Sequence, residues 1–325
     1  MFLVPDGDEL EIADAAATYL ADTMPIARLH RPDSADMDPA MRASLGEMGW
    51  FALALPEAAG GSGLTAIEHA LFFREVGRQC GPIDVLAQSL AALAIDDEVL
   101  RANILRGATG VALAVSGADE SRVFGSPEAT LVLSVSRERV EIFAQYGGAN
   151  NVRRSLDPAT SIALASQFAN PLVSTEGPLF WQLGQLGVAA MLVGIAEAAL
   201  KYTARYAKQR TQFETPISEF QMVQERLAEM KTNLDAGEAL VYLSAERFDK
   251  GQGEMSLGAE SKLFSAQMAT KVGLDAIQIL GGYGYMKEYP VERYMRDAKL
   301  MEIGAGTNEV MRLIVAKDLL KKVGE

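Results

Sequence analysis

Two separate segments of the chain carry residues suited to holding an anion such as a phosphate group. Arg210 offers a planar fork of donors that matches phosphate oxygens. Gly281 and Gly282, within the sequence QILGGYGY, let backbone amides approach an anion closely. The two histidines and single cysteine form no serine–histidine–aspartate or cysteine–histidine arrangement. Any redox chemistry therefore requires a bound cofactor.

Purely structural interpretations of these residues stay open. Arg210 is also placed to close the C-terminus of a helix, and the glycines to shape a turn between helices. Glu309 falls in the first turn of a predicted helix, where a carboxylate is favourable in any case. The charges between Glu292 and Lys299 are interpreted as a salt-bridged face. Trp50 and Trp181 are interpreted as core or interface residues.

Three segments resemble the acyl-CoA dehydrogenase family. The first segment, residues 281–309, contains the motifs GGYGY, EYPVER, RDAK and GTNE in the order and spacing of the family. Residues 206–221 resemble the family segment R-x-Q-F-G-x-P-I-x-x-F-Q, and residues 45–78 resemble its first domain. The resemblance covers most of the chain except about residues 108–175.

The resemblance implies that FAD is the cofactor, bound where the helical bundles of two subunits meet. Arg210 and Phe213 match residues that reach the pyrophosphate and adenine end of a neighbouring subunit's flavin. The other positions that match family contacts to FAD are Gln278, Gly281, Gly282, Thr307 and Glu309.

The catalytic base of the family is missing from its usual place. In the family reaction a carboxylate takes the α proton of an acyl-CoA thioester while the β hydrogen leaves as hydride to the flavin, so the base must reach Cα. This chain has Ala305 at the usual base position and Gly184 at the position used by another branch. The family's substrate-binding arginine falls at Gln185. The β-domain motifs T-E-P-x-x-G-S-D and W-I-[ST] are also missing, since residues 116–119 match the first too weakly to count.

This pattern resembles the non-catalytic subunits of α2β2 acyl-CoA dehydrogenases, where one subunit carries the base and the other completes the FAD site. Some bacteria use such assemblies on steroid side-chain thioesters. We therefore expect a partner subunit that acts with a homologous chain on an acyl-CoA substrate. One alternative is a self-sufficient homo-oligomeric enzyme whose base comes from Glu302, Glu309 or Glu176. The other alternative is a flavin-free scaffold or regulatory subunit.

The apolar periodicity predicts a mostly α-helical protein with a small β domain. Residues 1–107 are predicted to form an N-terminal helical domain, residues 108–175 a reduced β domain, and residues 176–325 a four-helix bundle. Strands are predicted at residues 111–115, 130–135, 140–143 and 161–165, with a hairpin at 136–139. The last bundle helix is predicted from the stripe Val310, Leu313, Ile314 and Leu320.

Composition excludes several classes of protein. A formal net charge of −13 argues against a nucleic-acid surface, which needs clustered lysine and arginine. His30 and His69 lie too far apart in sequence to suggest a metal site. No apolar run approaches the roughly 20 residues of a membrane span. The lone Cys80 excludes an internal disulfide, and the N-terminal residues lack a signal-peptide pattern, so a cytoplasmic protein is predicted.

Overall fold

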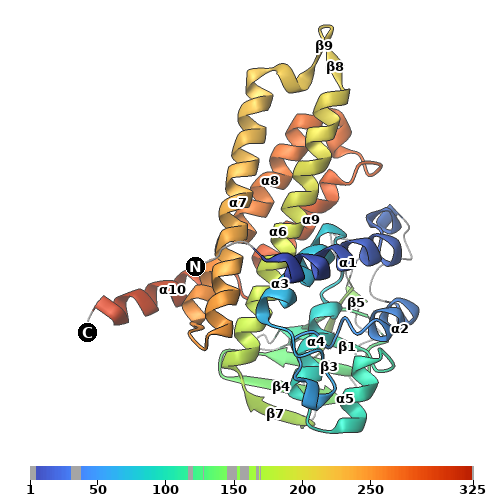
Figure 1. Ribbon diagram of the computed structural model, residues 1–325, viewed down its shortest axis with the longest axis vertical. Coiled ribbons are helices and arrows are strands. Elements are labelled where there is room, and N and C mark those ends of the chain that lie inside the picture. Colours follow the sequence, from blue (N-terminus) through green and yellow to red (C-terminus); the bar gives the residue numbers. More distant parts are fainter. Residues whose placement is uncertain are drawn as a thin grey trace. The chain divides into compact units, whose positions relative to one another are not determined.

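The computed structural model describes residues 5–30, 38–115, 120–126, 128–144, 152–153, 161–165, 168 and 170–323. This part of the chain is mainly helical and has one small mixed sheet, which confirms the predicted fold class (Figure 1). The chain forms two compact units, which we call the bundle unit (Met1–Leu10, Phe73–Cys80 and Gln185–Glu325) and the sheet unit (Glu11–Phe72 and Gly81–Gly184). The three domains predicted from the sequence, with boundaries after residues 107 and 175, stay a prediction.

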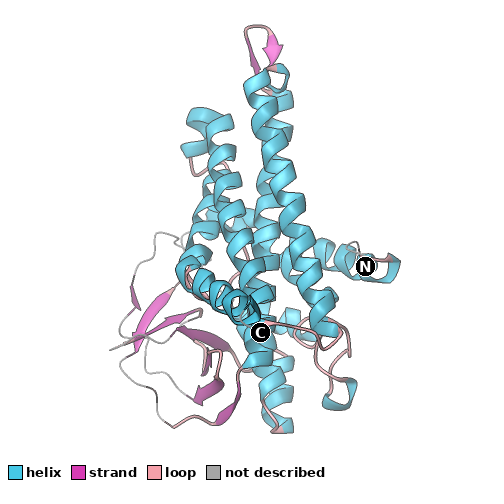
Figure 2. Cartoon of the chain, turned by 90° about the vertical axis from the view of Figure 1, so that its left-hand side faces the viewer, coloured by secondary structure: helices cyan, strands magenta, loops and turns pink. Residues whose placement is uncertain are grey.

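Long antiparallel helices make up the bundle unit (Figures 1 and 2). These are α6 (Pro178–Gln209), which enters the unit at Gln185, α7 (Gln221–Asp249), α8 (Met255–Leu280) and α9 (Val291–Ile303). Short connections join them, as expected for antiparallel neighbours. Both α7 and α9 pack against α8, whose buried face consists largely of alanine, glycine and serine. These small side chains let the neighbouring helices approach α8 closely.

The last predicted helix of the bundle is only partly packed. The stripe of residues 310–320 forms α10 (Asn308–Val323), in which Met311 and Ile314 are buried against α8. Leu313 and Leu320 of the same stripe are 59% and 71% exposed, so only part of the stripe packs within the chain. Helix α9 packs on α8 instead. It was not predicted as a helix because its many charged residues obscure the apolar periodicity. Its Arg296–Glu292 ion pair, with Nε 2.6 Å from Oε2, confirms the predicted salt-bridged face.

A close helix crossing within the bundle unit depends on two glycines. Gly77 of α3 (Ala66–Arg78) and Gly194 of α6 face each other's backbones. A Cβ atom on Gly77 would lie 2.0 Å from the carbonyl oxygen of Met191, and one on Gly194 would lie 1.9 Å from that of Arg74. Small residues thus let α3 and α6 approach each other closely. Arg74 extends it by donating to Glu238 and to the Tyr242 hydroxyl on α7, both at 2.8 Å.

Short helices form the helical part of the sheet unit. They are α1 (Gly7–Thr23, which begins in the bundle unit), η1 (Ile26–His30), α2 (Pro39–Glu47), η2 (Glu57–Ala59), the first part of α3, α4 (Asp84–Ala94) and α5 (Glu98–Leu105). Helix α2 begins at Pro39, because the Asp38 carboxylate caps it by accepting from the Met41 amide at 2.8 Å. A glycine-rich turn follows η2, with Gly60 at φ 85°. Trp50, stacked on Phe72 at 5.1 Å, is buried, as predicted.

The sheet has seven described strands in the order β5-β6-β2-β1-β3-β4-β7, with only β1 and β3 parallel. Their bounds are β1 (Val111–Val115), β2 (Ser121–Phe124), β3 (Leu131–Val135), β4 (Arg139–Ala144), β5 (Val152–Arg153), β6 (Ile162–Ala165) and β7 (Val173–Glu176). The four predicted strands and the β3–β4 hairpin are confirmed. The other three were not predicted because they are short and largely polar. Residues 116–119 lie outside the described residues.

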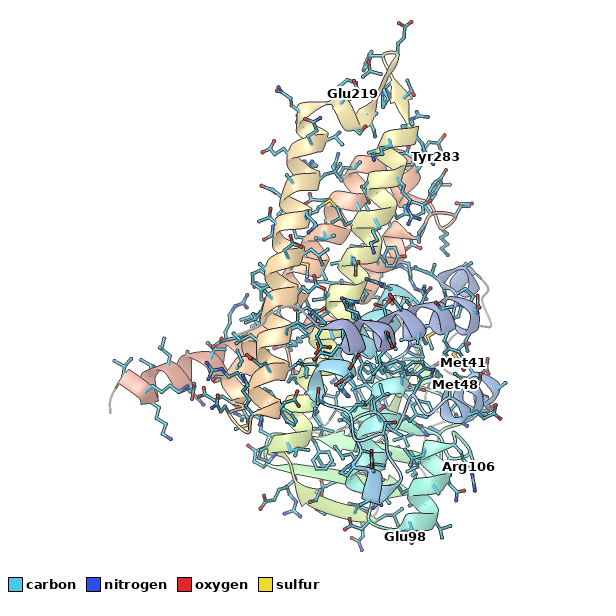
Figure 3. The ribbon with its side chains drawn as sticks, in the orientation of Figure 1. Met41, Met48, Glu98, Arg106, Glu219 and Tyr283 are labelled. Atoms are coloured by element: carbon cyan, nitrogen blue, oxygen red, sulfur yellow. The ribbon has the colours of Figure 1, made fainter. Side chains whose placement is uncertain are left out.

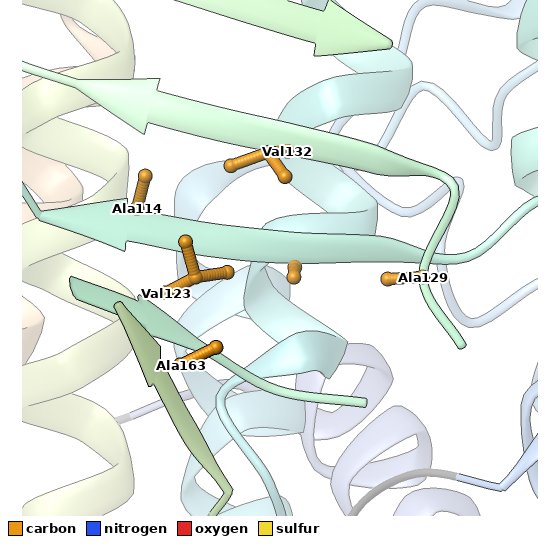
Figure 4. Close-up of a cluster of buried hydrophobic side chains, with 6 residues drawn as sticks. Ala114, Val123, Ala129, Val132 and Ala163 are labelled. Atoms are coloured by element: carbon orange, nitrogen blue, oxygen red, sulfur yellow. The ribbon is translucent and has the colours of Figure 1, made fainter. Parts of the chain in front are cut away.

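Small side chains form the buried cluster on this sheet (Figure 4). Its members are Ala112, Ala114, Val123, Ala129, Val132 and Ala163. Polar side chains of α4 connect the helices to the strands. The fully buried Gln88 donates to the Ile104 carbonyl at 2.8 Å and accepts from the Val111 amide at 3.1 Å, while Asp84 accepts from the Ser126 amide at 2.7 Å. Helices and sheet are thus joined within this unit.

Helix α6 is long and apolar enough, by length and composition alone, to cross a membrane. Its most apolar 18-residue window has a mean hydropathy of 1.7, higher than the sequence analysis anticipated. However, 78% of that window is buried inside the protein, which is typical of a core helix. We therefore interpret α6 as a core helix.

His69 makes the stability of the sheet unit depend on pH. Burial lowers the pKa of His69 to about 4, and its hydrogen bond to the Leu183 backbone offsets only part of that effect. Unfolded histidine has a pKa of about 6.5, so below that pH the unfolded chain binds a proton that the folded chain rejects. Stability is expected to be complete above about pH 6.5 and to fall by about 3 kcal/mol as the pH drops through about 4.

The His69→Gln variant is expected to lack this part of the acid sensitivity, because its side chain does not titrate. Urea unfolding of both proteins between about pH 4 and pH 7 measures their free energies of unfolding. The value for the wild type minus that for the variant should decrease as the pH falls. Parallel stability curves would contradict a buried neutral His69.

Candidate functional site

A pocket of about 670 Å³ lies in the bundle unit between the end of α6, the 3-10 turn η5 (Gly281–Tyr285) and the residues just before α9. Its lining includes three of the predicted cofactor-binding residues, namely Arg210, Gly281 and Gly282. Tyr283, labelled in Figure 3, also lines it. Residues more than 70 positions apart in sequence are thus brought together by the antiparallel path of α6, α7 and α8.

Arg210 follows the last residue of α6 and is half-buried. Its backbone amide donates to the Tyr206 carbonyl at 2.8 Å, and its carbonyl accepts from the Ile217 amide at 2.9 Å. The guanidinium carbon lies 5.7 Å from the centre of the Tyr283 ring, a cation–π arrangement. Among the described residues Arg210 has no ion-pair partner. Its donors are therefore oriented by an aromatic face and not neutralised by a carboxylate.

Tyrosines form one wall of this pocket, which the sequence analysis missed. The ring centre of Tyr283 lies 6.5 Å from that of Tyr206, in an edge-to-face arrangement, and 5.2 Å from that of Tyr289. Burial raises the pKa of Tyr206, and the neighbouring Arg210 partly opposes that rise. Such faces suit a flat aromatic ring or an apolar group. Glu288 also lines the pocket, and its charge disfavours an anion near that side chain.

Phe213 lies at the tip of a two-residue hairpin, outside the pocket lining. The hairpin joins β8 (Thr211–Gln212) to β9 (Thr215–Pro216), and both tip residues have positive φ, 50° at Phe213 and 63° at Glu214. This matches a type I′ turn, which favours glycine. The family segment has glycine at the second tip position, where this chain has Glu214. The Phe213 side chain is 90% exposed. It is therefore available to a partner and does not contact the pocket of its own chain.

The glycine segment serves both interpretations given above. Gly281 ends α8 with φ 61°, and its amide bonds the carbonyls of Ile277 and Gln278, so it shapes the turn. No atom lies within 4 Å of a Cβ built on Gly281 or Gly282, so their backbones stay open. The Gln278 side chain is exposed one turn earlier on α8. The segment thus caps a helix and still presents backbone to solvent.

Thr307 and Glu309 lie elsewhere, at the other end of α9. The 13 residues of that helix separate them from η5 by about 20 Å. The Thr307 hydroxyl accepts from the Val310 amide at 3.4 Å, at the start of α10. The pKa of Glu309 is lowered, first by a hydrogen bond to its own amide and then by Thr307. The structure therefore divides the predicted cofactor-binding residues between two places.

Ala305 precedes Thr307 in a left-handed conformation with φ 54°, and its side chain is a methyl group. Its carbonyl accepts from Gln185 Nε2 at 2.9 Å. Gln185 is 5% exposed, and its Oε1 atom has no hydrogen-bond partner among the described residues. The positions that match the family's base and its substrate-binding arginine are thus in direct contact, and neither side chain here can ionise.

Lys262 of α8 lies against the same loop and was not predicted. It is fully buried, and its ammonium group donates to the Gly306 carbonyl at 2.7 Å. The signal in the sequence was a lysine four residues after Gly258 and four before Ala266, both on the buried face of α8. This spacing places Lys262 on the same face of α8 as those two residues.

The other carboxylates considered as bases are engaged or exposed. Glu302 is ion-paired with Lys299. Glu309 is ion-paired with Arg312 at 3.0 Å and is 76% exposed. Glu176 is an exposed residue of β7 in the sheet unit. None of the three is both buried and unpaired.

These residues fit a dinucleotide such as FAD. Arg210 supplies an unpaired fork for phosphate, the glycines supply open backbone, and the tyrosines supply faces for a ring. Across the described residues, no group of three or more histidine, cysteine, aspartate or glutamate side chains is arranged to hold a metal ion. The hydrogen-bond donors of this pocket are of the kind that binds an organic phosphate.

Comparisons with known proteins concern the family and the fold of the chain. The model of the acyl-CoA dehydrogenase N-terminal domain matches residues 6–101, and that of the C-terminal domain matches residues 181–320. The probable acyl-CoA dehydrogenase YngJ of Bacillus subtilis is 33% identical over 338 residues, which cover 85% of this chain and 88% of that protein. An acyl-CoA dehydrogenase of the same organism is 49% identical over 138 residues, which cover 42% of this chain and 36% of that protein.

Solved structures share the fold over nearly the whole chain. A chain from a structure of the electron transferring flavoprotein of Acidaminococcus fermentans has a TM-score of 0.84 at 26% identity, covering 98% of this chain and 100% of that one. A variant of the Tcur3481-Tcur3483 steroid ACAD has a TM-score of 0.83 at 19% identity, covering 98% and 99%. The FAD complex of PigA has a TM-score of 0.82 at 20% identity, covering 98% and 99%. The last two likenesses concern the fold alone.

Proposed function

Since this chain belongs to the acyl-CoA dehydrogenase family, we propose that it is a subunit of a FAD-dependent acyl-CoA dehydrogenase and that it lacks the catalytic base. The observation that carries the proposal is Ala305. At the position of the family's base the side chain is a methyl group, and the backbone carbonyl is bound to Gln185. A methyl group takes no proton, so another chain must supply the base.

The reaction assigned to the assembly is α,β-dehydrogenation of an acyl-CoA thioester. Bound FAD would accept the β hydrogen as hydride, which no side chain can do. The α proton needs a carboxylate within reach of Cα. Glu302 and Glu309 are held by cations, and Gly184 has no side chain. This chain is therefore assigned cofactor binding and not proton abstraction.

The FAD-binding residues fall into two groups, which supports sharing of the cofactor between chains. Arg210, Gly281 and Gly282 lie at the pocket, with Gln278 and Phe213 nearby in sequence. Thr307 and Glu309 lie about 20 Å away along α9. We assign the first group to the pyrophosphate and adenine end of a flavin whose other end is held by a neighbouring subunit.

Exposed apolar side chains support an assembly of this kind. On α10 they are Val310, Leu313, Leu319, Leu320 and Val323. Phe213 at the hairpin tip is 90% exposed, although phenylalanine is normally buried. We propose that the partner is a homologous subunit carrying the base, in an α2β2 arrangement. The fold likeness to the Tcur3481-Tcur3483 steroid ACAD motivates testing steroid acyl-CoA substrates. The buried Cys80 fits a cytoplasmic assembly.

Replacing Arg210 with alanine is expected to weaken FAD retention. A charge-assisted contact to pyrophosphate contributes about 1.5–3 kcal/mol, so the dissociation constant should rise roughly 10- to 100-fold. Flavin fluorescence titration of the assembled protein measures it. Arg247→Ala is the matched control, because Arg247 is an exposed arginine at the far end of α7 that bonds Gln252. Equal flavin affinity in both variants would count against the role given to Arg210.

A further inference from the structure

Lys262 is a buried cation that neither the sequence motifs nor the proposed chemistry uses. Its side chain is 0% exposed, a rare environment for lysine. Its ammonium donates to the Gly306 carbonyl at 2.7 Å and lies 3.4 Å from both the Glu302 carbonyl and the Asn308 side-chain oxygen. These acceptors come from the end of α9, the following loop and the start of α10. One side chain thus connects three consecutive parts of the chain.

The loop held by Lys262, residues 304–307, has an unusual backbone. Ala305 and Gly306 both have positive φ, 54° and 90°. A non-glycine residue costs about 1 kcal/mol in this conformation and keeps it only where the surroundings impose it. Gln185 binds the Ala305 carbonyl and Lys262 binds the next one. Two side chains from α6 and α8 therefore fix two successive peptide units.

We propose that Lys262 is a positioning residue for the shared FAD site, whose ammonium group holds the 304–307 loop so that Thr307 and the first turn of α10 face the flavin. This inference rests on the proposed function, which makes Thr307 a cofactor contact. Lys262 itself does not touch the cofactor. It acts through the carbonyl of Gly306, one residue before Thr307.

The charge of Lys262 makes this role sensitive to pH. Burial lowers its pKa to about 8, and the carboxylates of Glu302 on α9 and Glu309 on α10 partly oppose that. From α6 the neutral Gln185 supports the same loop, and α7 presents the Leu240 carbonyl to the adjacent Ser261. Below about pH 8 the ammonium is charged and the loop is held. Above it the proton is lost and the hydrogen bonds weaken, so flavin affinity should fall as the pH rises.

Replacing Lys262 with methionine tests the inference, because methionine keeps the apolar stem and removes the donor. Lys271→Met is the control, since Lys271 lies on the same helix but pairs on the surface with Glu229 and Asp275. Hydrogen exchange of the Val310 and Met311 amides, which bond Thr307, is measured in the flavin-free chain. FAD affinity of the assembled protein is measured at about pH 7 and pH 9.5, on either side of the pKa.

We expect faster exchange at Val310 and Met311 in Lys262→Met and no change in Lys271→Met. Wild-type affinity for FAD should fall about tenfold between the two pH values, whereas Lys262→Met should bind weakly and equally at both. Overall unfolding should change little, since removing a buried charge offsets the lost hydrogen bonds.

Two other outcomes separate the failure of this inference from that of the proposed function. Unaltered exchange with normal FAD affinity in Lys262→Met overturns the inference alone. Altered exchange, with no FAD bound by any variant or by the wild type, overturns the proposed function and the cofactor role of Lys262 together.

Discussion

The chain purified by itself is expected to show no measurable turnover of acyl-CoA thioesters with an artificial electron acceptor. A positioned general base contributes about 10²- to 10⁴-fold to such a step, and the described residues offer none in place. Ala305 has only a methyl group, while Glu302 and Glu309 are ion-paired. Assays should span short, long and steroid acyl chains, because the substrate is unassigned.

The Ala305→Glu variant is expected to add little activity, with Ala305→Gln as the control of equal size. Gln185 still occupies the place of the family's substrate-binding arginine, so the restored carboxylate would lack its substrate-side partner. Robust turnover by the unmodified chain, lost on replacing Glu302, Glu309 or Glu176, would show that the base had been misassigned.

The Gly194→Ala variant is expected to lose about 3 kcal/mol or more of its unfolding free energy. Its new Cβ atom would lie 1.9 Å from the Arg74 carbonyl oxygen, a backbone atom that moves only with α3. Overpacking usually costs about 1–3 kcal/mol, and a clash with backbone belongs at the upper end. Separating α3 from α6 would also disturb the bonds of Arg74 to Glu238 and Tyr242.

Gly184→Ala provides the matched control on the same helix. There an added Cβ atom meets only the Leu90 side chain, at 3.5 Å. Alanine is the better helix former by about 1 kcal/mol, so this variant should be neutral or slightly stabilised. Urea unfolding compares the two. Equal midpoints would mean that the close crossing is not needed for stability.

The sequence motifs identified the residues of the candidate site, but the apolar periodicity did not predict how these residues are arranged in space. The spacing of GGYGY and GTNE identified residues 281–309, but the intervening charges were not interpreted as a helix. Because that segment forms α9, Gly281 and Thr307 lie at its opposite ends, about 20 Å apart. A linear motif does not carry this separation, which depends on how α9 packs on α8.

Two features were missed because the sequence signals polarity without showing burial. Lys262 interrupts an apolar stripe, and a lysine in such a place is ordinarily taken as solvent-exposed. Tyr206 and Tyr283 stand in separate motifs, and only the antiparallel path of α6 and α8 brings their rings within 6.5 Å. The fold class and the strands rich in valine and leucine were predictable because apolar spacing determines them directly.

The most direct test of the shared site is native mass spectrometry of this chain co-expressed with a homologous subunit that carries glutamate at the position of Ala305. Our account predicts a mixed tetramer containing both chains and about two flavins per four chains, because closed two-fold symmetry would then generate two complete sites. A stable homotetramer of this chain, carrying four flavins and excluding every homologue offered, would contradict it.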